Sequence, residues 1–72
     1  METEYAVILE KAPNNWAAYS PDVPGCIAVG DTPEETLDNY RSALDFHFRG
    51  LMEDGLPLPL PTALARSVKV AA

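Results

Sequence analysis

The chain has 72 residues, with 11 acidic and five basic side chains and a formal net charge of −6 at pH 7. This length predicts a single domain over residues 1–72, and the acidity argues against direct nucleic-acid binding, which needs a basic patch. One cysteine and one histidine exclude an internal disulfide and a zinc site of Cys and His ligands. No apolar run is long enough for a membrane span, and the acidic start at Met1–Glu4 is unlike a signal peptide, so a cytoplasmic location is expected.

Three short strands are predicted in the first half of the chain. Tyr5–Lys11 is apolar on both faces at its centre, and Trp16–Ser20 follows a turn at Pro13–Asn15. Pro21–Gly25 must end the second strand, because prolines fix φ and lack an amide donor. Cys26–Val29 is the third strand. The order predicts an antiparallel meander.

A long helix is predicted next. Thr32 is a good N-cap, Pro33 suits the first helical position, and Glu35 completes a capping box. The helix is expected to run to about Asp54, with Gly55 as the residue after the C-cap. Apolar residues at spacings of three and four predict one buried face, made of Leu37, Tyr40, Leu44, Phe48 and Leu51. A charged face is predicted beside it, made of Glu34, Asp38, Arg41, Asp45 and Arg49, with pairs Asp38–Arg41 and Asp45–Arg49.

The segment after the helix is expected to be extended. Leu56–Pro61 alternates leucine with proline, and a residue before proline avoids helix. Arg66–Val70 alternates in character and is predicted to form a last strand. The predicted fold is α+β with order β-β-β-α-β, strand order 3-2-1-4, the last strand parallel to the first and the helix on one face. Trp16 and Tyr19 have opposite parity, so one of them must face away from the helix. The small core and this apolar surface predict a homodimer or higher homo-oligomer.

No catalytic, metal or cofactor site is expected. Cys26 and His47 could form a nucleophile–base pair, but a small buried side chain is the better account of Cys26. Asp22 and Asp31 could belong to a metal-dependent nuclease site. Acids around a turn and a helix start are, however, expected for structural reasons.

The motifs of this chain resemble those of the HicB-like antitoxins of bacterial type II toxin–antitoxin systems. The resemblance covers about residues 5–61. The matching positions are Trp16, Pro21-Asp22-Val23-Pro24-Gly25-Cys26, Gly30-Asp31-Thr32, Glu34-Glu35, Leu37, Asn39, Ala43-Leu44, Gly55, Pro57 and Pro59.

The resemblance implies a truncated ribonuclease H-like fold without the nuclease site. It also implies a partner, a small basic HicA-type toxin that cleaves mRNA and whose active site the antitoxin covers. Many family members carry a C-terminal DNA-binding segment, and since this chain ends at Ala72 no direct DNA binding is expected. Two alternatives stay open: an orphan homo-oligomeric structural domain and a minimal metal-dependent ribonuclease H-like nuclease.

The residues of interest fall into two groups. The predicted partner contacts are charged residues of the helix and aromatic residues of the second strand: Trp16, Tyr19, Glu34, Asp38 and Asp45. The predicted structural residues shape the turns and the helix start: Pro21, Asp22, Pro24, Gly25, Gly30, Thr32 and Glu35.

Overall fold

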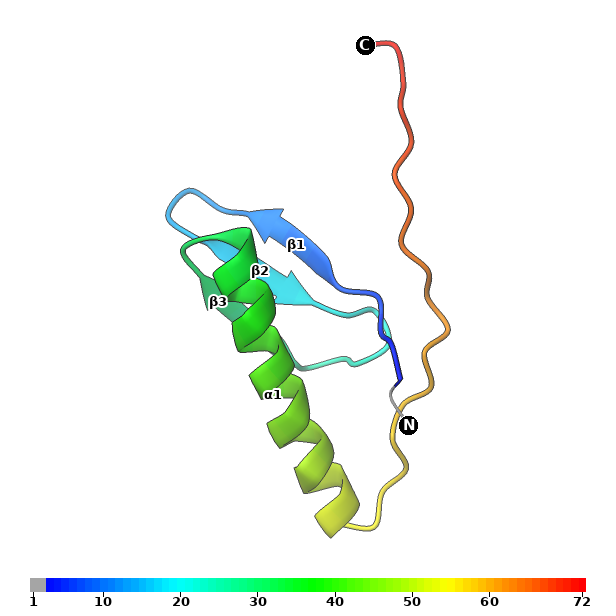
Figure 1. Cartoon of the computed structure of the whole chain (residues 1–72). Helices are drawn as coiled ribbons and strands as arrows, with labels where there is room; N and C mark the ends of the chain where they lie inside the picture. The colour runs from blue at the N-terminus through cyan, green and yellow to red at the C-terminus, as the bar shows by residue number, and fades with distance from the viewer. Residues whose placement is uncertain (1–2) are drawn as a thin grey trace.

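A computed structural model describes residues 3–72, so Met1 and Glu2 of the acidic N-terminal segment lie outside the described residues. The elements are β1 (Ile8–Lys11), β2 (Trp16–Tyr19), β3 (Ile27–Gly30) and α1 (Pro33–Glu53). The strands form one antiparallel sheet in the order β1-β2-β3, and α1 packs across one face of it (Figure 1). The predicted α+β class and antiparallel meander are confirmed.

The strand register decides which side chains face the helix. Leu9 is opposite Ala18, and Ala18 is opposite Ala28. Ala18 is fully buried in a cluster with Tyr40 of α1, so this row of residues faces the helix. The neighbouring row, which contains Tyr19, therefore faces away from it.

The strands are shorter than predicted because the turns take residues from their ends. Tyr19 is the last residue of β2, so the predicted strand residues before Ile8 have no β2 residue opposite them. They still pack on the core through Tyr5 and Val7. Cys26 N–H is bonded within the turn to Val23 O (3.4 Å), and β3 therefore starts at Ile27.

The turn at Pro21–Gly25 is shaped by a glycine and by a buried valine. Gly25 has φ +85°, a left-handed conformation that other residues adopt only at a cost. Val23 is almost fully buried, and its N–H donates to Ser20 O (3.2 Å). Pro21 and Pro24 are exposed at the surface of this turn.

The predicted start of α1 is confirmed. Thr32 Oγ1 accepts from Glu35 N–H (3.0 Å), while Glu35 Oε1 accepts from Asp31 N–H (2.9 Å). Gly30 lies directly against this cap. A Cβ placed on it would come within 2.7 Å of Thr36 Oγ1, so the last residue of β3 must be small for the helix to pack there.

The predicted end of α1 is confirmed as well. Gly55 has φ +69°, and its N–H donates to Met52 O (3.1 Å). Leu56 N–H donates to Leu51 O (2.8 Å). These two bonds form a Schellman motif, which satisfies the last carbonyls of the helix. The helix continues unbroken through Gly50.

The predicted buried face of α1 is correct at its centre but not throughout. Tyr40 is fully buried, and Leu44 and Phe48 pack against the core. Leu37 is wrongly assigned to this face, since 39% of it is exposed. The small polar residue Thr36 is fully buried instead, because its hydroxyl donates to Thr32 O (2.6 Å) at the close approach of α1 to Gly30.

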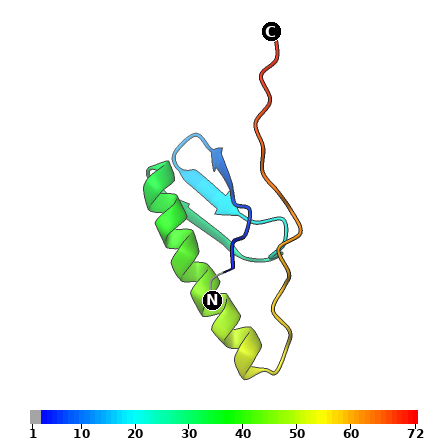
Figure 2. The same cartoon turned by 45° about the vertical axis from the view of Figure 1, so that its right-hand side comes forward.

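The predicted fourth strand is not formed in residues 3–72. The chain after α1 is extended, but Arg66–Val70 has no strand beside it and is exposed. Figures 1 and 2 show the segment passing back along the molecule and then standing clear of the sheet. The prediction rested on an alternating pattern, which favours an extended backbone but supplies no partner. Within the described residues the strand order is thus 3-2-1, without a strand 4.

The buried core is small. The buried hydrophobic residues described by the structure are Ala18, Val23, Cys26 and Tyr40. Among residues 3–72, eleven large hydrophobic side chains are exposed, more than the buried core contains. Apolar surface of this extent on a small domain usually serves as an interface.

Candidate protein-binding surfaces

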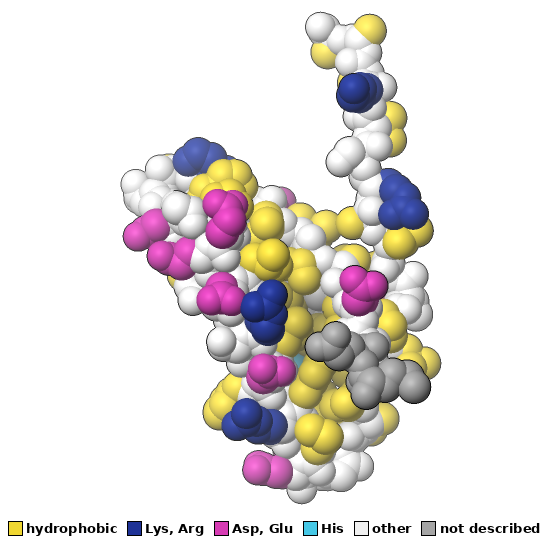
Figure 3. Space-filling model, viewed as in Figure 1, with side chains coloured by type: hydrophobic (Ala, Val, Ile, Leu, Met, Phe, Trp, Pro, Cys, Tyr) yellow, Lys and Arg dark blue, Asp and Glu magenta, His cyan; other side chains and the backbone are white. Residues whose placement is uncertain are grey.

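The charged face of α1 is on the side of the helix turned away from the sheet. Glu34, Asp38 and Asp45 are all exposed there. Figure 3 shows acidic side chains spaced along the helix beside a band of apolar ones. We call Glu34, Asp38 and Asp45 the acidic stripe.

One predicted ion pair crosses the acidic stripe. Arg41 Nη1 lies 2.8 Å from Asp38 Oδ1, with both side chains largely exposed. Such a pair contributes at most about 1 kcal/mol to stability. The second predicted pair, between Asp45 and Arg49, is not formed in residues 3–72. Within residues 3–72 the carboxylate of Asp45 therefore has no ion-pair partner.

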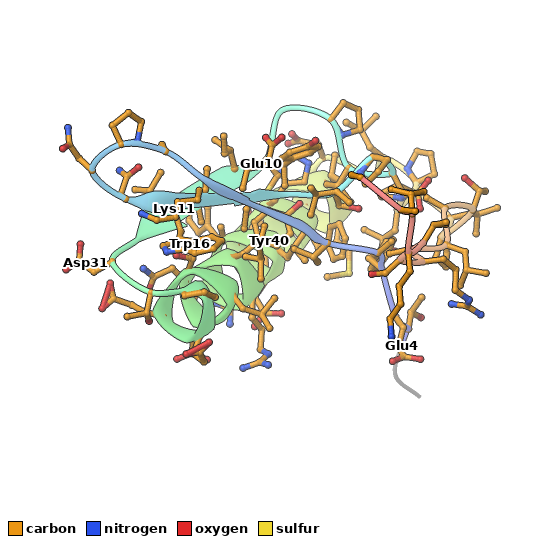
Figure 4. The ribbon with its side chains drawn as sticks, turned by 90° about the horizontal axis from the view of Figure 1, so that it is seen from above. Glu4, Glu10, Lys11, Trp16, Asp31 and Tyr40 are labelled. Carbon is orange, nitrogen blue, oxygen red and sulfur yellow. The ribbon has the colours of Figure 1, made fainter. Side chains whose placement is uncertain are left out.

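Trp16 and Tyr19 lie on opposite faces of the sheet. Trp16 is opposite Gly30 on the helix side of the sheet, where Lys11 Nζ lies 5.8 Å from the centre of its ring (Figure 4). Tyr19 is on the outer face, opposite Ile27. The five predicted contact residues thus do not all lie on one face of the molecule.

The exposed hydrophobic residues were not predicted individually. Phe46 is 80% exposed and Ile27 is 63% exposed. Both line an open hollow between the start of β3 and the second half of α1, which also contains Ala43, Gly50 and Leu51. A signal for Phe46 exists in the sequence, because it does not fit the spacing of the buried stripe of the helix.

A second hollow lies on the opposite side of the helix, between α1 and the N-terminal segment that leads into β1. We call it the β1–α1 groove. Its lining combines apolar side chains with one acid and one base: Thr3, Glu4, Tyr5, Val7, Leu37, Tyr40, Arg41 and Leu44. The groove remains open because α1 packs mainly against β3 and β2 and contacts β1 little.

Cys26 and His47 do not form a catalytic pair in the structure. Both line the hollow beside Phe46, but the described residues include no hydrogen bond between them. Cys26 is buried, and this burial raises the pKa of its thiol. A raised pKa keeps the sulfur protonated at neutral pH, whereas a nucleophilic cysteine needs the thiolate.

The hydroxyl of Tyr40 is an unsatisfied polar group in the core. Tyr40 is fully buried, and its hydroxyl has no hydrogen-bond partner among the described residues. Burial raises the pKa of this hydroxyl and Cys26 raises it further, while the nearby backbone of Ser20, which does not reach hydrogen-bond geometry, lowers it. The phenol therefore stays neutral, as the core requires.

Asp22 binds the chain that follows the helix. Its carboxylate accepts hydrogen bonds from Thr62 N–H (3.0 Å), Thr62 Oγ1 (2.7 Å) and Ala63 N–H (2.9 Å). We call this arrangement the Asp22 clamp. The bonds from Ala63 and Thr62 lower the pKa of Asp22. Its predicted structural role therefore extends to a segment 40 residues away.

The Asp22 clamp involves one of the two acids, Asp22 and Asp31, on which the nuclease alternative depends. The Asp22 carboxylate is occupied by the clamp, and Asp31 lies in the turn before α1. Within residues 3–72 no three His, Cys, Asp or Glu side chains gather where they could hold a metal ion.

Within the same residues, no helix combines the length and the apolar character that crossing a membrane demands.

The fold and these surfaces define an acidic α+β domain with exposed apolar side chains on both sides of its one described helix. The family model of the HicB-like antitoxins of bacterial toxin–antitoxin systems matches residues 5–71. The chain belongs to this family, as its motifs predict.

Individual relatives agree with this assignment. The chain is 36% identical over 58 residues to Antitoxin HicB 2 of Photorhabdus laumondii subsp. laumondii, covering 81% of this chain and 42% of the relative. It is 40% identical over 55 residues to an uncharacterized 14.9 kDa protein of Haemophilus phage HP1, covering 76% of this chain and 41% of the relative. The chain thus spans about two fifths of the length of these two relatives.

A solved structure shows the same fold. It is described as the HicA3 and HicB3 toxin-antitoxin complex, and one of its chains is similar to this one with a TM-score of 0.69 and 33% sequence identity. The match covers 79% of this chain and 66% of that chain.

Proposed function

We propose that this chain acts by binding, as an antitoxin that neutralises a small basic mRNA-cleaving toxin of the HicA type by covering its active site. The observation that carries the proposal is the similarity to a chain of the HicA3 and HicB3 complex, at 33% identity. The family match over residues 5–71 supports it. Neutralisation by binding requires no catalytic group in the antitoxin itself.

The charge of the chain suits such a partner. A net charge of −6 favours encounter with a basic protein, because complementary charges steer association. The acidic stripe presents three of these charges on one side of α1. Asp45 has no ion-pair partner within the described residues, so a cation of the toxin would meet it without displacing an existing pair.

The apolar part of the contact is assigned to Phe46. Interfaces are anchored by large buried side chains surrounded by polar ones, and aromatic residues are common anchors. Phe46 is 80% exposed, and since successive helical residues point about 100° apart, a partner that contacts both Phe46 and Asp45 must extend around this side of α1. Trp16 and Tyr19 remain predicted contacts on other parts of the surface.

The test is binding to a HicA-type toxin, made inactive for expression, from the operon that encodes this chain. A complex with a dissociation constant at or below the micromolar range is expected, together with inhibition of RNA cleavage by the active toxin. No complex at micromolar concentrations contradicts the proposal.

Matched variants locate the surface. Asp45→Lys and Asp31→Lys change the net charge equally, but only Asp45 belongs to the acidic stripe. Asp45→Lys is expected to weaken binding at least about tenfold, which corresponds to 1.4 kcal/mol, and Asp31→Lys much less. Phe46→Ala is expected to weaken binding by a similar factor. Equal effects of the two lysine variants would remove the acidic stripe from the interface.

A further inference from the structure

Residues 62–72 differ in charge from the rest of the chain. They contain Arg66 and Lys69 and no acidic residue, whereas the other 61 residues hold all 11 acidic side chains and three basic ones. The side chains of residues 62–72 therefore carry a formal charge of +2, whereas those of residues 1–61 carry a formal charge of −8. Its hydrophobic residues are far from any core, since Val68 is 82% exposed and Val70 is 77% exposed. We call residues 64–72 the free tail.

The free tail is held in an extended form and away from its own sheet. The Asp22 clamp fixes Thr62 and Ala63, and the chain beyond them stands clear of the body in both views (Figures 1 and 2). Its alternation of valine with polar residues over 66–70 is typical of a strand with one buried face. An extended, alternating segment without a neighbour has the properties of a strand that lacks a sheet.

One edge of the sheet has the complementary properties. Ala12 N–H donates to Asn15 O (2.8 Å), which makes these two residues a hydrogen-bonded pair of the hairpin. Because such pairs alternate along an antiparallel ladder, Leu9 and Lys11 turn their N–H and C=O groups away from β2. In the described part of the chain nothing bonds to these groups, so β1 is an open edge.

The other edge of the sheet is already in use. The same alternation turns the carbonyl of Val29 away from β2, and Asn39 Nδ2 of α1 donates to it at 2.9 Å. The helix also packs most closely against β3. An added strand is therefore expected at β1 rather than at β3, since exposed strand edges are the usual sites of strand addition.

We propose that Arg66–Val70 of one copy of this chain adds as a strand to the β1 edge of a second copy, and that the two copies exchange tails. A strand beside β1 would place Val68 and Val70 over the β1–α1 groove, whose lining includes Val7, Leu37 and Leu44. The exposed valines of one copy would thus cover exposed apolar surface of the other.

The charges fit this arrangement. Arg66 has the same parity as the two valines and would lie at the groove, which includes Glu4. Lys69 has the opposite parity and would face the outer side of the sheet, the side of Glu10. A second copy of the chain is therefore an acidic partner with an open edge and an apolar groove, and reciprocal exchange closes the assembly as a symmetric dimer. This inference is independent of the proposed toxin binding.

The first test is self-association of the full chain without toxin, measured by sedimentation. A dimer is expected, and Val68→Asp with Val70→Asp should weaken it at least about tenfold. Leu60→Asp is the matched control, since Leu60 is 78% exposed in the same extended segment but precedes the clamp, and this variant should remain dimeric. A monomeric wild-type chain, or equal weakening by all the variants, contradicts the proposal.

The second test distinguishes exchange from a tail that folds onto its own sheet. A nitroxide is attached to the cysteine of a Ser67→Cys variant that contains no ¹⁵N. This protein is then mixed with ¹⁵N-labelled chain that carries no nitroxide. Chain without the substitution is treated identically to measure any reaction at the buried Cys26. Loss of amide signal at Leu9 and Lys11 of the ¹⁵N chain is expected. Signal loss only when nitroxide and ¹⁵N are in the same molecule would overturn the exchange.

Discussion

Two glycines of this chain illustrate opposite roles of the same residue. Gly30 has Thr36 Oγ1 and Thr36 N within 2.7 and 2.9 Å of the position that a Cβ would take. Gly50 lies within α1, and a Cβ on it would meet nothing within 4 Å. Space is therefore the requirement at Gly30, whereas at Gly50 nothing in the fold demands a glycine.

Alanine substitutions should therefore have opposite effects at the two positions. Gly30→Ala is expected to lower the free energy of unfolding by about 1–3 kcal/mol, because the helix start must move away from β3. Gly50→Ala is expected to raise it by about 0.5–1 kcal/mol, because glycine is a poor helix former. Urea denaturation of the three proteins measures both. A stabilising Gly30→Ala would show that the contact at the helix start is not needed.

At the scale of elements, the Asp22 clamp joins the turn between β2 and β3 to the segment that leaves α1. The segment makes another contact on the way, since Tyr5 donates its hydroxyl proton to Pro59 O (2.6 Å). The pKa of Asp22 is lowered by its bonds from Ala63 and Thr62, so the folded chain favours the carboxylate. The clamp therefore contributes stability above the ordinary pKa of an aspartate and loses it as the pH falls through the lowered value.

Acidification should release the extended segment before the fold is lost. The amide signals of Thr62 and Ala63 are expected to move toward unfolded positions as the pH falls below about 4, while those of β2 stay in place. Asp22→Ala should produce the same change at neutral pH. Asp31→Ala is the control, because Asp31 takes part in the described bonds through its backbone N–H only. Unchanged Thr62 and Ala63 signals in Asp22→Ala would contradict the clamp.

The elements were predictable where local signals define them. The cap at Thr32, the end at Gly55 and the three strands follow from residues close in sequence, and the structure confirms them within a few positions. The clamp was not predictable, because a bond between residues 40 apart leaves no periodic pattern. The prediction that Arg66–Val70 forms a fourth strand in the sheet of its own chain was wrong for the same reason. Alternation of apolar and polar residues favours an extended backbone but does not identify the strand that it would pair with.

The exposure of the predicted contact residues was predictable on the helix but not on the strands. Helical spacing correctly predicted that Glu34, Asp38 and Asp45 are exposed on one side of α1. The same spacing could not place Trp16 and Tyr19, whose relation to the helix depends on strand register. Phe46 was not predicted, because helical spacing identifies the buried face of α1 but gives no role to a large apolar residue outside it.

At the scale of the whole molecule, the distribution of charge is the property that governs encounters. The acidic side chains all precede residue 62, and the only bases after that residue are Arg66 and Lys69. A basic partner is attracted to the body and not to the free tail. The two proposed contacts, with a toxin and with a second copy, therefore use different parts of the chain.

Binding of a basic toxin should consequently depend on salt in a particular way. The association rate is expected to fall by roughly tenfold or more between low and high ionic strength, because exposed charges are screened beyond the Debye length. The dissociation rate should change much less. Stopped-flow mixing at a series of NaCl concentrations measures both rates. An association rate independent of salt would show that the acidic body does not steer the encounter.

The Asp22 clamp also limits how the chain can vary in length. It closes a ring that begins at Asp22, passes through β3 and the 21 residues of α1, and returns through the prolines to Thr62. Helix and prolines are stiff, so the ring has little slack. One residue inserted into α1 would lengthen the helix by about 1.5 Å and rotate its end by roughly 100°. The length of α1 thus determines whether Thr62 reaches Asp22. Insertions should be tolerated in the Pro13–Asn15 hairpin, which lies outside the ring, but not between Asp22 and Thr62.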